Sequence, residues 1–218
     1  MTLVFHALAH ESRREIMMKR ITVSVAAALT MGGTAFATPF FAPPAEPKVT
    51  FKANGNYEVS EAFLMEMACV QDRMTQRMWD DYGAVLVLNG DNPKPKVAVA
   101  EALDDCVSEH LWGDAERLLA DQTAQNTAIW DFQNLELSAI KITPENLQAA
   151  WGSLSADDRR HFMDAGWNND APFVARVDAA LRANGVRNNA EVLETARIAL
   201  GAFTYMAVTR DKWVQRYR

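Results

Sequence analysis

The chain has 218 residues, of which 49% are hydrophobic and 23% are charged. These fractions are typical of a folded globular protein, and the length is sufficient for one domain with a sizeable core. The formal net charge is −6. An acidic surface repels phosphate groups, so the composition excludes a general DNA- or RNA-binding protein.

The segment 1–37 has the pattern of a secretory signal peptide. A basic run at 18–20 (MKR) precedes an apolar run at 21–33, and an Ala-x-Ala motif follows at 35–37. We therefore expect cleavage after Ala37 and a mature protein in the periplasm or secreted from the cell. The apolar run is shorter than the roughly 20 residues of a membrane-spanning helix, so we expect no membrane span after cleavage. An uncleaved N-terminal anchor is the alternative interpretation.

The residues on either side of this signal are also informative. Residues 1–16 are polar, which is uncommon at the start of a signal peptide, and translation from Met17 or Met18 would give an ordinary one. Residues 38–57 are rich in proline and glycine and have no apolar period. We predict an extended linker there, followed by a helical domain over 58–218.

Two amphipathic segments between positions 59 and 112 each carry one of the two cysteines. Ser60 can cap the first segment, and Glu61 places a negative charge in its first turn. Helical spacing in the first segment links Val59, Phe63, Met67, Val70, Met74 and Met78, with Cys69 beside them. The second segment begins through Pro93 and Pro95, and its helical spacing links Val99, Leu103, Cys106, Val107 and His110. We predict one helix for each cysteine.

Export to an oxidising compartment favours a disulfide between Cys69 and Cys106. The bridge would connect the two helices and stabilise the fold. A redox-active pair is not expected, because there is no Cys-x-x-Cys motif and no adjacent cationic cluster in the sequence to lower a thiol pKa. Two separate buried thiols are the remaining alternative.

The rest of the chain carries further helix signals. N-cap residues are expected at Asp114, Thr143, Ser155, Asp170 and Asn189. We expect the run 84–88 to end a helix at Asn89-Gly90, and we expect a break near Asn126. No internal repeat is visible. The predicted fold is an all-α array or bundle of six to eight helices with one disulfide, preceded by a signal peptide.

Six tryptophans are many for this length, and each is either a core residue or part of a groove for a peptide or glycan. The final turn is the strongest candidate interface. Its residues Trp213, Arg216, Tyr217 and Arg218 belong to types that dominate interface hot spots. The alternative is an amphipathic final turn that packs on the domain.

No residues in the sequence form a catalytic or metal-binding pattern. His110 is expected to point to the core with Cys106, whereas Asp105 and Glu109 share the outer face, so these groups should not converge on a metal. His161 lies on a predicted surface turn. The adjacent carboxylates 80–81, 104–105 and 157–158 point about 100° apart on a helix, so they form no acid–base pair. We expect no metal, no cofactor and no catalytic residue that the sequence can identify.

Three functions remain open. The first is an exported α-helical binding or accessory protein that acts through a protein partner, and we expect this rather than an enzyme. The second is a cell-wall hydrolase with dispersed carboxylates, which would require a cleft containing a buried carboxyl group of raised pKa. The third is a periplasmic chaperone. Small acid-stress chaperones of the periplasm share the feature of two cysteines on two helices, and this chain resembles them in that feature alone.

Overall fold

The computed structural model describes residues 47–218 of the chain. The predicted signal peptide and positions 38–46 of the predicted linker lie outside the described residues. The elements in chain order are β1 (Val49–Phe51), β2 (Tyr57–Val59), α2 (Glu61–Asp72), α3 (Gln76–Val87), α4 (Pro93–His110), α5 (Asp114–Ala139), α6 (Pro144–Ser153), α7 (Ala156–His161), the 3-10 helix η1 (Trp167–Asn169), α8 (Ala171–Ala183) and α9 (Ala190–Gln215). The described residues are thus mostly helical, with eight α-helices, in agreement with the predicted fold class.

The first two elements form a short antiparallel hairpin that the sequence analysis did not predict. Val49 pairs with Val59 and Phe51 pairs with Tyr57, and Gly55 adopts a φ of 80° in the connecting turn. The side chain of Val49, the first residue of β1, is buried in the core. The predicted linker is therefore wrong for positions 49–57, because alternating apolar side chains there pack on the helices.

The first cysteine segment is two helices instead of one. The apolar spacing continues past Asp72, but α2 ends there and Thr75 caps α3 by accepting a hydrogen bond from the backbone N–H of Met78. The end of α3 is as predicted, since its last turn closes at Leu88 and Asn89 follows with a positive φ. The predicted turn at Asn89-Gly90 is confirmed.

Helix α5 is continuous over 26 residues, so the predicted break near Asn126 is wrong. The Asn126 side chain donates to the carbonyl of Gln122 within the helix and causes no interruption. The helix begins one residue earlier than expected. Gly113 is its N-cap, and the Glu116 carboxylate accepts from the Gly113 backbone N–H. The predicted N-caps at Thr143, Ser155, Asp170 and Asn189 are confirmed.

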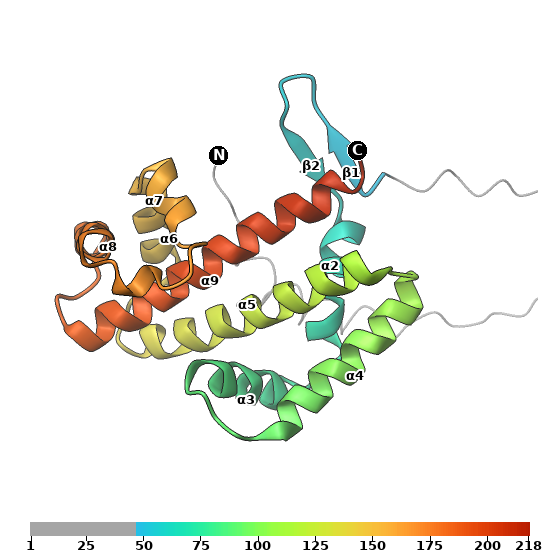
Figure 1. Cartoon of the computed structure of the whole chain (residues 1–218), viewed down its shortest axis with the longest axis horizontal. Coiled ribbons are helices and arrows are strands. Elements are labelled where there is room, and N and C mark those ends of the chain that lie inside the picture. Colours follow the sequence, from blue (N-terminus) through green and yellow to red (C-terminus); the bar gives the residue numbers. More distant parts are fainter. Residues whose placement is uncertain (1–46) are drawn as a thin grey trace, which may run out of the picture. The chain divides into compact units, whose positions relative to one another are not determined.

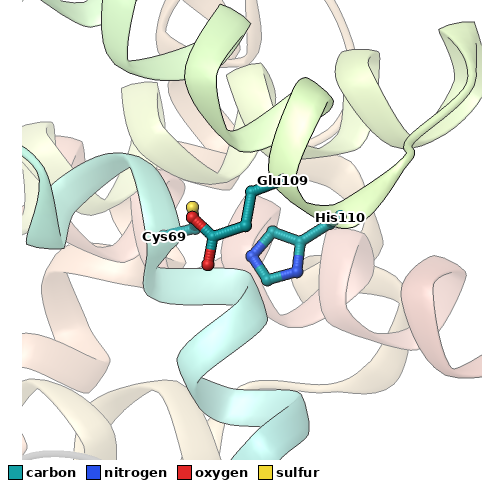
Figure 2. Close-up of side chains that lie close together, drawn as sticks. All are labelled: Cys69, Glu109 and His110. Carbon is teal, nitrogen blue, oxygen red and sulfur yellow. The ribbon is translucent and has the colours of Figure 1, made fainter.

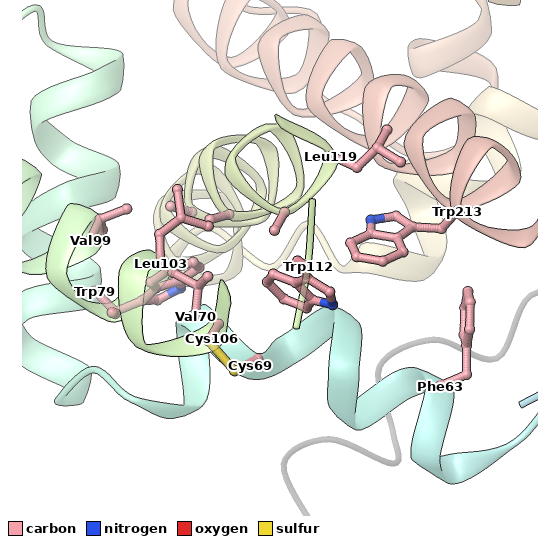
Figure 3. Packing of buried hydrophobic residues seen from close by; sticks show 14 of the residues in the cluster. Phe63, Cys69, Val70, Trp79, Val99, Leu103, Cys106, Trp112, Leu119 and Trp213 are labelled. Atoms are coloured by element: carbon pink, nitrogen blue, oxygen red, sulfur yellow. A yellow bond between two sulfur atoms is a disulfide. The ribbon is translucent and has the colours of Figure 1, made fainter. Parts of the chain in front are cut away.

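Helices α5 and α9 pack along each other and extend through both hydrophobic clusters of the described core. In Figure 1, α3 and α4 lie beside α5, while α6, α7 and α8 gather at one end of α9. One cluster joins the hairpin, α2 to α5 and the C-terminal end of α9, and in it the indoles of Trp112 and Trp213 meet edge to face (Figure 3). The other cluster joins the far ends of α5 and α9 to α6–α8.

A close helix contact gives the first testable prediction. A Cβ atom on Gly83 of α3 would lie 2.6 Å from the Ala128 carbonyl oxygen and 2.8 Å from the Phe132 Cβ on α5. Since backbone atoms cannot move aside cheaply, we expect Gly83→Ala to reduce the free energy of unfolding by about 1–3 kcal/mol in chemical denaturation. Gly152→Ala is the matched control, because a Cβ there meets nothing within 4 Å. Equal stability of the two variants would contradict this packing.

Candidate functional site

The predicted disulfide is present between Cys69 on α2 and Cys106 on α4, with a Cα–Cα distance of 6.1 Å. Cys106 is fully buried, and Cys69 is nearly so. Figure 3 shows the bridge at the edge of the cluster that contains Trp79 and Trp112. The bridge therefore connects α2 to α4 directly over the hydrophobic core.

The surroundings of the bridge differ from the sequence prediction. Glu109 and His110 were expected to diverge, yet a carboxylate oxygen of Glu109, a ring nitrogen of His110 and the Cys69 sulfur lie within 4.8 Å of one another. Figure 2 shows both side chains directed toward Cys69. The prediction fails because the side chains in the last turn of α4 face α2. How α2 packs against α4 cannot be inferred from the spacing of residues within α4.

Two further contacts orient these groups. The Arg73 guanidinium donates to the Glu109 carboxylate and lies 3.6 Å from a carboxylate oxygen of Asp105. The His110 ring stacks on Trp112 with the ring centroids 5.1 Å apart. While the disulfide is closed, its sulfurs are not thiolates, so the cluster offers a metal only one carboxylate and one imidazole.

A groove of about 500 Å³ lies between α6, α7 and α9. We call it the α6–α9 groove. Its lining residues are Trp151, Ala156, Arg159, Arg160, Thr204, Ala207, Val208 and Asp211. Trp151 is anchored at the base because its indole N–H donates to the Thr204 hydroxyl at 3.0 Å and its ring meets Phe203 edge to face. The groove therefore combines an apolar base with charged rims.

The charged side chains of the groove differ in whether they have a hydrogen-bond or ion-pair partner among the described residues. The Arg159 guanidinium lies over the Trp151 ring, 4.6 Å from its centroid, and no carboxylate of the described residues pairs with it. Arg160 pairs with Asp157. Asp211 accepts from the Tyr57 hydroxyl at 2.5 Å. Arg159 is thus a fixed cation whose N–H groups remain available to an anionic group.

The sequence analysis missed this groove. It considered a groove only as a general role for tryptophans and did not link any tryptophan to an arginine. The signal that could have found the groove is the spacing between Trp151 and Arg159. The end of one predicted helix and the N-cap Ser155 of the next lie between these two residues. Such a short connection allows the second helix to fold back over the first.

A second hollow of about 340 Å³ lies between α3 and α4. Its lining includes the aliphatic side chains of Met78, Pro93 and Val97. Val97 is exposed. No aromatic ring lines this hollow, so it lacks the stacked arginine and tryptophan of the α6–α9 groove.

The predicted interface at the C-terminal turn is largely occupied by contacts within the protein. Trp213 is 1% exposed, and Arg216 pairs with Glu116. The Tyr217 hydroxyl donates to a Glu66 carboxylate oxygen at 2.9 Å. The Arg218 guanidinium lies 4.9 Å from the centroid of the Phe51 ring. These contacts match the alternative interpretation, in which the final turn packs on the domain.

Glu66 is a buried carboxylate at the centre of this packing. It accepts from Lys48 at 2.5 Å, from the Trp112 indole N–H at 2.8 Å and from Tyr217. Burial is the largest influence and raises its pKa, but the three hydrogen bonds together outweigh burial and hold the pKa of Glu66 below its ordinary value. Burial, and then the hydrogen bond to Glu66, raise the pKa of Tyr217 to about 12. Glu66 therefore stays ionised and joins the hairpin, α2 and the final turn.

The remaining histidine of the sequence analysis, His161, is half-buried between two carboxylates. Its ring nitrogens lie 2.9 Å from Asp164 and 3.0 Å from Asp170. Its ring packs on Phe173 at a centroid distance of 4.5 Å. These contacts connect the end of α7 to the start of α8.

Comparisons of the chain with models of protein families, with curated proteins and with solved structures find no match. The functional argument therefore rests on the geometry of the described residues. Within residues 47–218, no helix combines the length and the apolar character that a membrane span requires.

Proposed function

We propose that this is an exported binding protein that acts through a protein partner, and that it holds an acidic segment of that partner in the α6–α9 groove. The observation that carries the proposal is the Arg159 guanidinium, which lies over Trp151 without a carboxylate partner among the described residues. Export is inferred from the sequence pattern of residues 1–37 and agrees with the disulfide.

The chemistry of the groove favours an acidic peptide. Arginine binds carboxylates through paired N–H donors, and stacking on an aromatic ring holds its planar group in place. The apolar groove atoms of Ala207 and Val208 can contact side chains that flank the acidic residue. The protein is acidic overall, so a local cation also directs an acidic ligand to this position.

A glycan is less well matched to the same groove. Sugars bind tryptophan by lying flat on the ring, but the Arg159 guanidinium covers one part of the Trp151 indole and Phe203 packs against its ring. A sugar would have to displace Arg159 first. The peptide interpretation uses the stacked arrangement as it stands.

The hydrolase alternative required a buried carboxyl group with a raised pKa. Glu66 is the buried carboxylate of the described core, but its pKa is lowered and its oxygens already accept three hydrogen bonds. A general acid needs a proton near neutral pH. Glu66 therefore supports the fold and gives no support to that alternative.

Selection from a random peptide library displayed on phage, with the mature protein immobilised, tests the proposal. We expect enriched peptides to contain Asp or Glu beside apolar residues. Their binding should weaken as salt concentration rises, because the contact is ionic and near the surface. Arg159→Ala should lower the affinity for such a peptide by roughly tenfold or more in calorimetry.

Arg117→Ala is the matched control, because Arg117 is an exposed arginine that pairs with Asp104 away from the groove. It should leave the affinity unchanged. Enriched peptides without acidic residues, or an equal loss of affinity in both arginine variants, would contradict the assignment of the groove.

A further inference from the structure

We propose that the protein binds one zinc ion through Cys69, Cys106, Glu109 and His110 once its disulfide is reduced. This inference is independent of the α6–α9 groove, since it concerns α2 and α4. It assigns a second chemical state to a bridge that otherwise only stabilises the fold.

The four ligands come from two helices that the disulfide already holds together. Cys106, Glu109 and His110 occupy positions i, i+3 and i+4 of α4, so they share one face of that helix. Cys69 faces them from α2. One ligand atom each from Cys69, Glu109 and His110 lies within 4.8 Å of the others (Figure 2). The Cys106 sulfur is bonded to the Cys69 sulfur at 2.05 Å, so it lies directly beside this cluster.

The donor set suits zinc. Two thiolates, one imidazole and one carboxylate give the four ligands of a tetrahedral site, and zinc accepts sulfur, nitrogen and oxygen donors. Zinc–ligand bonds of about 2.0–2.3 Å place tetrahedral ligand atoms about 3.3–3.8 Å apart. The cluster can reach such spacing by side-chain rotations, because Glu109 is exposed and His110 is half-buried.

The existing partners of the ligands allow this change. Arg73 would release the Glu109 carboxylate and retain Asp105, which lies 3.6 Å from it. Trp112 supports the His110 ring by stacking and would keep it directed toward the sulfurs.

The steps balance with a dithiol protein as the reductant. The dithiol transfers two electrons and two protons to the Cys69–Cys106 bridge, which becomes two thiols while the reductant becomes a disulfide. Zinc then binds both sulfurs, and two protons leave the thiols for solvent. Exchange with a protein disulfide, which takes up two electrons and two protons and becomes a dithiol, would reform the bridge and release the ion.

Titration of the mature protein with Co²⁺ and then Zn²⁺ tests the inference. The disulfide is first reduced under argon with a phosphine, which takes one oxygen from water as it supplies two electrons to the bridge. We expect one Co²⁺ per chain, with a thiolate-to-cobalt charge-transfer band and the strong visible bands of tetrahedral cobalt. Zn²⁺ should abolish both. The oxidised protein should show neither, and a reduced protein without the charge-transfer band would overturn the inference.

Variants of the two non-cysteine ligands make the test specific. His110→Ala and Glu109→Gln should each weaken Zn²⁺ binding by roughly tenfold or more, since even outer partners of a metal site have effects of that size. Glu101→Gln, an exposed position on the same helix, should bind as tightly as the parent. Equal binding in all three variants would place the ion on the cysteines alone and overturn the four-ligand site.

Circular dichroism during the titration covers the case in which reduction unfolds the chain. Metal binding is then coupled to folding, so Zn²⁺ should restore the helical signal of the reduced parent. A reduced chain that remains unfolded with excess Zn²⁺ would contradict the inference. Full restoration of the signal in His110→Ala at a Zn²⁺ concentration that only half restores the parent would also contradict it.

Discussion

Replacing both cysteines by alanine is expected to lower the thermal midpoint of the protein by about 8–16 °C. The two cysteines are 37 positions apart, and a closed loop of that length stabilises a fold by about 4 kcal/mol on the chain-entropy model. For a chain of this size, each kcal/mol corresponds to roughly 2–4 °C. Differential scanning calorimetry under oxidising conditions measures the change.

The control for this prediction is the parent protein in a phosphine reductant without metal. It should lose a similar part of its stability, whereas the double alanine variant should not respond to the reductant. An unchanged midpoint in the variant, or two free thiols in the protein isolated from its native host, would contradict a structural role for the bridge.

Glu66→Ala is expected to reduce the free energy of unfolding by about 2–4 kcal/mol. The substitution leaves the buried indole N–H of Trp112 without its acceptor, and it removes the partner of the Tyr217 hydroxyl and of Lys48. Chemical denaturation measures the loss. Glu58→Ala is the matched control, because Glu58 pairs with Lys52 on the exposed surface of the hairpin and should contribute less than about 0.5 kcal/mol.

The effect of Glu66 should also depend on pH. Its pKa in the folded protein lies below the ordinary value of 4.5, so the unfolded chain binds the proton more readily. The stabilisation is therefore complete above pH 4.5 and is lost as pH falls through the folded pKa. The difference between the parent and Glu66→Ala should shrink over that range. A constant difference down to acid unfolding would contradict the proposed network.

Local signals in the sequence predicted much of the fold. Thr143, Ser155, Asp170 and Asn189 were predicted as N-caps, and capping depends on side chains within three residues of the helix start. The division between α2 and α3 was missed because the apolar spacing continues through it. There, the Thr75 cap outweighs an unbroken helical pattern.

The candidate sites could not be predicted to the same extent, because they depend on how helices pack. The position of Arg159 over Trp151 requires α7 to fold back on α6 and α9 to supply Thr204. The approach of Glu109 and His110 to Cys69 depends on the position of α2. The C-terminal residues were selected by type, and their internal partners Glu66 and Glu116 lie about 100 positions or more away in the sequence.

Crosslinking in the native host tests the central claim, that the protein binds a partner through the α6–α9 groove. A photoreactive amino acid placed at Ala156 lies in the groove, and one placed at Val97 lies in the hollow between α3 and α4. The account predicts a discrete crosslinked protein from position 156 that is absent from position 97 and is lost when Arg159→Glu is added. No adduct at position 156, or the same adducts from both positions regardless of Arg159, would contradict it.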